Sequence, residues 1–266
     1  MNRRRLPLPL ARAALLALVS FAGPALSARP ADPSVSFTVS MPRPVAHIFH
    51  VTLRAEGFAG ELLDLKMPAW MPGFYRIMDY QKYVSNFRAS DGQGRPLDWE
   101  KITRNGWRVV ASGAATVVVD YDVFGNTNFA ANNFLDETRA FIAPPGMFLY
   151  PDGRLQTPVT LTVELPAGWT RIGTGLDPVP GRAAAFTAPD FDTLYDCPIL
   201  LGNQEVRTFD VRGVPHTLVL ENIAPAVDRA RVASDLARMV EASVGLMEDI
   251  PYKHYTFLLI GRGNGG

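Results

Sequence analysis

Residues 116–123 read TVVVDYDV, and they carry the clearest β-strand pattern of the chain. β-Branched and aromatic residues suit a pleated surface, and apolar and polar residues here alternate with a period near two. The same alternation recurs in three other segments: residues 36–40 (SFTVS), 46–53 (AHIFHVTL) and 159–165 (VTLTVEL). Turn signals such as Asp91-Gly92 separate the runs. We therefore expect a mainly β fold, with an antiparallel β-sandwich over residues 33–222.

The pattern changes near Ile223. From Ala224 to Met247, apolar residues recur at spacings of three and four, which predicts an amphipathic helix beginning around Pro225. Residues 255–260 (YTFLLI) are nearly all apolar, as in a strand that is buried on both faces. Such a strand needs neighbours, and only a glycine-rich run follows it. We therefore expect residues 223–266 to be the incomplete α+β start, a helix and then a strand, of a second domain.

The amino-acid composition excludes several classes of protein and of site. The chain has 266 residues, of which 47% are hydrophobic and 20% charged, and this balance is typical of a globular protein. Lys and Arg together number 26, as do Asp and Glu, so no excess of positive charge indicates a nucleic-acid partner. Cys197 is the single cysteine, which excludes an internal disulfide and a zinc site built from several thiolates.

The first 28 residues are predicted to be a secretory signal peptide. An apolar run at residues 13–22 and a small-residue run at 25–28 follow four arginines: Arg3, Arg4, Arg5 and Arg12. That order is typical of a signal peptide cleaved near Ser27 or Ala28. The alternative, an uncleaved membrane anchor, would need an apolar run of about 20 residues. We therefore expect an exported protein, periplasmic or secreted, that has no membrane partner once the signal peptide is cleaved.

Two motifs could suggest a metal or a nucleotide. His47 and His50 are three residues apart, but on a strand they would point to opposite faces, so we interpret them as ordinary strand residues. Gly261, Gly263 and Gly266 match a G-x-G-x-x-G pattern after an apolar strand. A dinucleotide site also needs a following helix and a later acidic residue, and neither is present. We predict no catalytic residue and no metal ligand in this chain.

Residues 67–80 (MPAWMPGFYRIMDY) form the most distinctive segment. Two prolines and a glycine restrict the backbone around Trp70, and Tyr75 and Asp79 follow. A stiff surface loop of this kind can present aromatic and carboxylate groups to a ligand. It can equally be a structural loop that closes one end of the sandwich, and the residue chemistry leaves both interpretations open.

The same segment resembles a peptidase family. Residues 70–75 (WMPGFY), followed by Asp79 and Tyr80, are similar to the Trp-x-Pro-Gly-x-Tyr signature of the M61 glycyl aminopeptidases. Further similar blocks follow in the order of that family, and they lie at residues 87–94, 107–109, 135–150, 165–176 and 190–202. The resemblance extends from about Ser34 to the end of the sequence. Cys197 departs from it, because a small residue such as Ser is usual there.

The resemblance implies a zinc-dependent aminopeptidase with a β-rich N-terminal domain and a thermolysin-like catalytic domain. Gly265 and Gly266 resemble the start of the family's Gly-Gly-Leu-Glu-His segment, which precedes His-Glu-x-x-His. The sequence contains no His-Glu-x-x-His, so we expect zinc only in the complete parent enzyme, no cofactor in this chain, and no activity of this chain alone. The complete enzyme would bind a peptide substrate and remove N-terminal Gly or Ala. Tyr75 and Asp79 are candidates, with the two glycines, for substrate binding.

A second hypothesis assigns a non-catalytic role to the same fold. A β-sandwich with exposed aromatic residues can bind a peptide or a carbohydrate without transforming it. The chain would then be an exported binding module. Reading the gene beyond codon 266 distinguishes the two, because only a peptidase gene would continue into His-Glu-x-x-His. The oligomeric state stays open.

Overall fold

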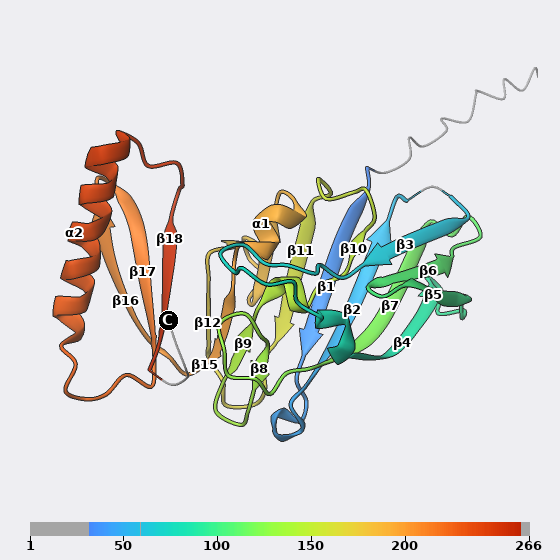
Figure 1. The fold of residues 1–266 in the computed structure, drawn as a ribbon, viewed down its shortest axis with the longest axis horizontal. Helices are drawn as coiled ribbons and strands as arrows, with labels where there is room; N and C mark the ends of the chain where they lie inside the picture. Colours follow the sequence, from blue (N-terminus) through green and yellow to red (C-terminus); the bar gives the residue numbers. More distant parts are fainter. Residues whose placement is uncertain (1–31, 59, 262–266) are drawn as a thin grey trace, which may run out of the picture. The chain divides into compact units, whose positions relative to one another are not determined.

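The computed structural model describes residues 32–58 and 60–261, and the predicted signal peptide lies outside them. The fold is mainly β, as expected, and only two α-helices occur in the described part (Figure 1). The largest sheet has seven strands, in the order β13 (Asp177–Pro178), β14 (Ala185–Ala188), β11 (Val159–Glu164), β1 (Ser34–Ser40), β2 (Ile48–Glu56), β7 (Thr116–Phe124) and β4 (Val84–Asp91).

Alternation along the strands places one face of this sheet in the core. In β7 the side chains of Val117, Val119, Tyr121 and Val123 are buried, and those between them are half-buried. β2 pairs with β7 in an unbroken antiparallel ladder, which keeps this face continuous. The prediction of antiparallel pairing holds for all pairs of the sheet except β1 with β11, which run parallel.

Two four-stranded sheets accompany the large one. One has the order β10 (Tyr150–Pro151), β3 (Leu62–Lys66), β6 (Gly106–Val110) and β5 (Trp99–Thr103). The other has the order β12 (Arg171–Thr174), β15 (Ile199–Gly202), β9 (Ala140–Ile142) and β8 (Phe134–Leu135). Three short 3-10 helices, Pro44–Ala46, Tyr80–Tyr83 and Pro144–Gly146, and helix α1 (Phe191–Tyr195) connect strands. In the core that these sheets share, the ring of Phe37 packs against the rings of Phe148 and Phe191.

The C-terminal elements form a further sheet and the longer of the two helices. β16 (Glu205–Val211), β17 (Val214–Glu221) and β18 (Tyr255–Ile260) make a three-stranded sheet, and α2 (Arg229–Met247) lies along it (Figure 1). β17 and β18 run parallel, because α2 carries the chain back across the sheet. The domain boundary predicted at residue 222 falls between β17 and β18 of this sheet, and it stays a prediction.

Helix α2 begins later than the sequence pattern predicted. Its first residue is Arg229, because the carboxylate of Asp228 accepts hydrogen bonds from the backbone N–H groups of Ala230 and Arg231, both at 3.0 Å. An N-cap of this kind satisfies donors that the first turn leaves without partners. The expected burial of β18 on both faces is wrong. β18 is an edge strand, and its Tyr255 and Leu259 are exposed.

No helix in the two described ranges is long and apolar enough to cross a membrane.

Candidate functional site

The loop at residues 67–80 is held in place at both ends. Its first residue, Met67, is fully buried and exchanges hydrogen bonds with Asn105, whose amide nitrogen lies 2.6 Å from the Met67 carbonyl oxygen. At the other end the Tyr80 hydroxyl donates to the carbonyl oxygen of Ala131 at 2.9 Å, and burial raises the pKa of Tyr80 to about 12. The loop therefore leaves and re-enters the core at fixed points.

Within the loop, the backbone closes on itself. The N–H of Met78 donates to the carbonyl of Ala69 at 2.6 Å, and the indole N–H of Trp70 donates to the carbonyl of Phe74. Gly73 has a φ of +77°, a left-handed conformation that side chains disfavour, so glycine suits the turn between these contacts. These hydrogen bonds hold the loop in addition to the backbone restriction that its two prolines and its glycine predicted.

The predicted site residues of this loop lie apart. Tyr75 is 99% exposed, and Asp79 forms an ion pair with Arg104, with 2.7 Å between the guanidinium nitrogen and the carboxylate oxygen. Gly265 and Gly266 lie outside the described residues. Neither Tyr75 nor Asp79 lines the pocket beside the loop, so their role in substrate binding stays a prediction.

A pocket of about 720 Å³ lies between this loop and helix α1. We call it the Trp70 pocket. One wall comes from the loop, a second from the segment around Tyr150, and a third from α1 and the residues after it. Its lining consists of Pro68, Ala69, Trp70, Pro72, Tyr150, Leu155, Asp192, Thr193, Tyr195, Asp196 and Cys197. Aromatic rings and prolines dominate, and two aspartates supply the charge.

Helix α1 and the residue after it bring two aspartates, Asp192 and Asp196, to the lining of the pocket. The Asp190 side chain caps the helix by accepting a hydrogen bond from the Thr193 N–H at 2.7 Å. This cap fixes the start of the helix, so that Asp192 and Asp196, four residues apart, fall on the same side. Both are exposed, and no basic side chain within the described ranges forms an ion pair with either of them.

Cys197 lines the same pocket but is not an activated nucleophile. Burial, with the nearby carboxylates of Asp196 and Asp177, raises the pKa of the Cys197 thiol to about 11. The thiol is therefore protonated at neutral pH, whereas nucleophilic cysteines have a lowered pKa. A cysteine where the resembling family has a small residue does not add chemistry here.

Two buried tyrosines support the pocket wall that contains Tyr150. The hydroxyl of Tyr121 donates to the Met147 carbonyl at 2.9 Å, and the hydroxyl of Tyr195 donates to the Phe148 carbonyl at 3.2 Å. Burial raises the pKa of both phenols, so both stay protonated donors at neutral pH. The Trp70 pocket was not predicted from the sequence, although the spacing of Asp192 and Asp196, four residues apart, was a visible signal for it.

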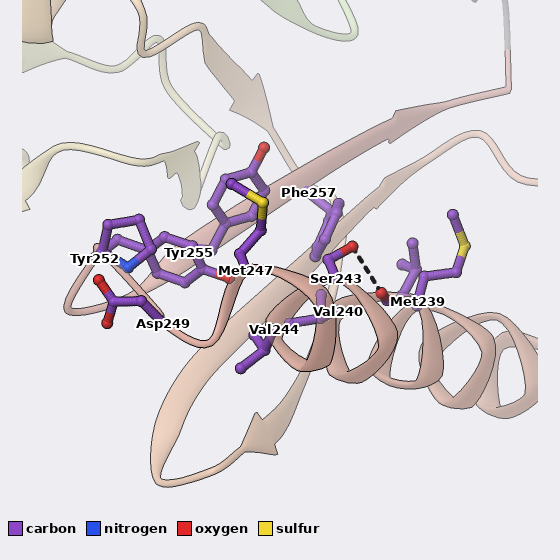
Figure 2. Close-up of a pocket in the computed structure, with 11 residues that line it drawn as sticks. Met239, Val240, Ser243, Val244, Met247, Asp249, Tyr252, Tyr255 and Phe257 are labelled. Atoms are coloured by element: carbon purple, nitrogen blue, oxygen red, sulfur yellow. Dashed lines mark hydrogen bonds between the residues drawn. The ribbon is translucent and has the colours of Figure 1, made fainter.

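A second pocket lies between α2 and β18, and Figure 2 shows its side chains. We call this pocket of about 580 Å³ the α2–β18 groove. Its lining consists of Leu236, Met239, Val240, Ser243, Val244, Met247, Asp249, Pro251, Tyr252, Tyr255 and Phe257. Met239 and Met247 are 65% and 73% exposed. The groove is an open apolar surface with Asp249 as its charged residue.

The histidines have structural roles. His216 is fully buried, and its Nδ1 donates to the Val214 carbonyl at 2.9 Å while its Nε2 accepts from the Tyr252 hydroxyl at 3.1 Å. His50 contacts Asp122 at 2.5 Å, as expected for a strand residue. His47 is not on the strand, because it ends a 3-10 helix in a left-handed conformation and contacts the Leu135 carbonyl.

The described residues do not fit a zinc site. No three of their histidine, cysteine, aspartate or glutamate side chains gather closely enough to hold a metal ion. Gly261, the described member of the predicted glycine pattern, has a packing role. A Cβ atom added there would lie 2.2 Å from the carbonyl oxygen of Asn222.

Comparisons with known proteins found one matching family model and similar solved structures. The family model of the peptidase M61 N-terminal domain matches residues 36–203. A solved structure from Idiomarina loihiensis, an aminopeptidase N family protein, is 28% identical with a TM-score of 0.79, covering 87% of this chain and 40% of its own. An M1 zinc metallopeptidase from Deinococcus radiodurans shares the fold at 15% identity and a TM-score of 0.50, covering 87% of this chain and 56% of its own. No curated protein matches.

Proposed function

Because this chain belongs to the M61 peptidase family through its N-terminal domain, we propose that it forms the N-terminal part of an exported, zinc-dependent aminopeptidase. The observation that carries this proposal is the family match over residues 36–203, which covers most of the β-sandwich. The fold agrees with it, since one similar structure is an aminopeptidase N family protein and another a zinc metallopeptidase. The chain spans 40% and 56% of the lengths of these two proteins.

The α2–β18 groove is the surface on which the catalytic portion of such an enzyme would pack. Large exposed apolar patches in soluble proteins mark interaction surfaces, and this one includes Met239, Met247 and Tyr255 (Figure 2). β18 also leaves one edge of its sheet without a partner strand among the described elements. Both features fit a domain that continues across this face.

The family supplies the proposed chemistry of the whole enzyme. Zinc bound outside the described residues would activate water for attack on a peptide bond after an N-terminal Gly or Ala. The described residues contain no group of three candidate ligands for this metal. This chain would contribute the substrate-facing loop with Tyr75 and Asp79, and by itself it would not hydrolyse peptides.

Activity and metal content test the proposal together. The 266-residue chain, and the product of the gene read in frame beyond codon 266, are assayed with Gly- and Ala-p-nitroanilide and for bound zinc. We expect no hydrolysis by the short chain, and one zinc with release of Gly and Ala by the extended product. Hydrolysis by the short chain, or a gene that stops at codon 266 without a peptidase sequence beyond it, would contradict the proposal.

Export has a separate test. Mass spectrometry of the protein purified from its host's periplasm or medium should find a chain that begins near residue 28. A chain recovered only from the cytoplasm with residues 1–28 intact would refute the export proposal and leave the peptidase proposal unaffected.

A non-catalytic binding module is the second candidate, and the Trp70 pocket favours it. The pocket presents aromatic rings and two aspartates that form no ion pair with a basic side chain of the described residues, a combination that suits ligand binding. The two candidates are compatible when the pocket serves the enzyme as a binding site.

A further inference from the structure

We propose that the Trp70 pocket binds the side chain of an arginine or lysine in a peptide. This inference goes beyond the aminopeptidase proposal, because it concerns binding by this chain without hydrolysis. It rests on the composition of the pocket walls, on the charges that face the pocket, and on the rigidity of the loop that forms one wall.

The walls suit a long side chain with an apolar stem. Trp70 is 49% exposed, and its indole N–H is already donated to Phe74, so the ring face is what it offers a ligand. Pro68 and Pro72 flank it, and Tyr150 lies on another wall. Methylene groups of arginine and lysine pack on such surfaces, and their cationic heads are attracted to aromatic faces.

The charges of the pocket select a cation. Asp192 and Asp196 both line it, and neither is paired with a basic side chain within the described ranges. Two like charges four residues apart repel each other, and Asp196 directly follows the last turn of α1, where negative charge is disfavoured. A bound cation removes two unfavourable terms, the repulsion between Asp192 and Asp196 and the interaction of Asp196 with the C-terminal end of α1. An anionic ligand would increase them, and a neutral sugar would leave them as they are.

The behaviour of the neighbouring thiol supports this sign of the electrostatic potential. Burial is the main cause of the raised pKa of Cys197, and the carboxylates of Asp196 and Asp177 add to it, so these carboxylates make the electrostatic potential at the thiol more negative. The same field favours an ammonium or guanidinium group.

Hydrogen bonds within the protein hold two walls of the pocket. The hydrogen bonds of Met78 to Ala69 and of Trp70 to Phe74 fix the loop, and Asp190 caps the helix on the opposite side. A pocket whose walls are already held in place loses less conformational entropy when a ligand binds to it. Its volume of about 720 Å³ is in the range of small-ligand sites and exceeds what one side chain fills, leaving room for flanking peptide.

Titration calorimetry of the full chain with blocked tripeptides tests the proposal. The probes are acetyl-Ala-Arg-Ala-amide, its Lys, Gln and Glu analogues, and Gly-Ala-Ala-amide, whose only cation is the terminal ammonium. We expect the Arg and Lys peptides to bind at least tenfold more tightly than the others. Raising NaCl from 20 to 500 mM should weaken that binding several-fold, because salt screens exposed charges.

Three variants locate the binding. Asp192→Asn/Asp196→Asn should weaken Arg-peptide binding at least tenfold, and Trp70→Leu should weaken it several-fold. The control Glu137→Gln/Glu164→Gln changes the net charge equally at exposed positions outside the pocket and should bind as the unchanged chain does. Thermal unfolding of each variant confirms that it is folded.

Cys197 provides a readout at the site itself. Its alkylation by N-ethylmaleimide at pH 8 should slow when the Arg peptide is present, because the thiol lines the pocket. Equal affinity for the Gln and Arg peptides would overturn the proposal, as would an equal loss in the control variant. Binding of Gly-Ala-Ala-amide alone would assign the pocket to a terminal ammonium and would also overturn it. None of these outcomes depends on peptidase activity.

Discussion

Replacing Tyr121 with phenylalanine should destabilise the protein by about 2 kcal/mol. The Tyr121 hydroxyl donates to the Met147 carbonyl at 2.9 Å and accepts from the Leu149 N–H at 3.3 Å, and both of those residues are fully buried. Phenylalanine keeps the packing and leaves both backbone groups without a partner. An unsatisfied buried polar group costs about 1–3 kcal/mol, and the longer second bond contributes the smaller share.

Thermal unfolding followed by circular dichroism measures this cost. In a domain of this size about 2 kcal/mol corresponds to a fall in Tm of about 4–8 °C. Tyr195→Phe loses a single hydrogen bond of 3.2 Å, so its Tm should fall by about half as much. Tyr75→Phe is the exposed control and should leave the Tm unchanged, since Tyr75 is 99% exposed. A Tm for Tyr121→Phe within about 1 °C of the unchanged chain would refute the reasoning.

The pH dependence gives a second check of the same residue. Burial raises the pKa of Tyr121, so above about pH 10 the unfolded chain loses the phenolic proton while the folded chain keeps it. The stability of the unchanged protein therefore falls as pH rises, by about 1.4 kcal/mol per pH unit from this group. Tyr121→Phe lacks this loss, so the stability gap between the two proteins should narrow between pH 10 and pH 11. A constant gap would contradict the burial argument.

Three further changes have expected outcomes. Asp64→Asn breaks a bidentate ion pair with Arg108, at 2.7 Å for both bonds, and should cost about 1 kcal/mol in urea unfolding at pH 7. Because the pKa of Asp64 is lowered in the fold, that difference should shrink as pH falls below about 4. Gly261→Ala brings a Cβ to 2.2 Å from the Asn222 carbonyl oxygen and should lower stability by about 1–3 kcal/mol in the same assay. Asp190→Ala removes the cap of α1 and should cost about 1 kcal/mol, with weaker Arg-peptide binding in calorimetry.

The five segments that local patterns predicted as strands all form strands, and they account for five of the 18 strands in the described residues. The segment at residues 116–123 became β7, and residues 255–260 became β18 with the predicted bounds. These predictions succeed because side-chain alternation and β-branched composition are properties of a short segment and follow from the pleat of a strand. The start of α2 was less accurate, since a stretch of periodic residues does not show which side chain caps the helix. Asp228 does so three residues after the expected start, and the helix begins at Arg229.

The candidate site was predicted only in part. The rigid loop at residues 67–80 was visible because prolines and glycine restrict the backbone wherever they occur. The pocket beside the loop was not, since Trp70 and Asp192 are far apart in sequence and meet only after folding. Tyr75 and Asp79 were predicted because they lie in a restricted loop with polar side chains at its tip. Tyr75 is 99% exposed, Asp79 is paired with Arg104, and their role in substrate binding stays a prediction.

The sequence by itself determined the β character of the chain, the position of the C-terminal helix and the M61 family, because each is written in short segments that interact with themselves or match a motif. Only the tertiary structure decided that β1 and β11 pair in parallel, that β18 is an exposed edge strand, and that two aspartates line the same pocket as Trp70. Those features depend on which distant segments pack together. Packing is set by the burial of whole faces at once, and no single segment contains that information.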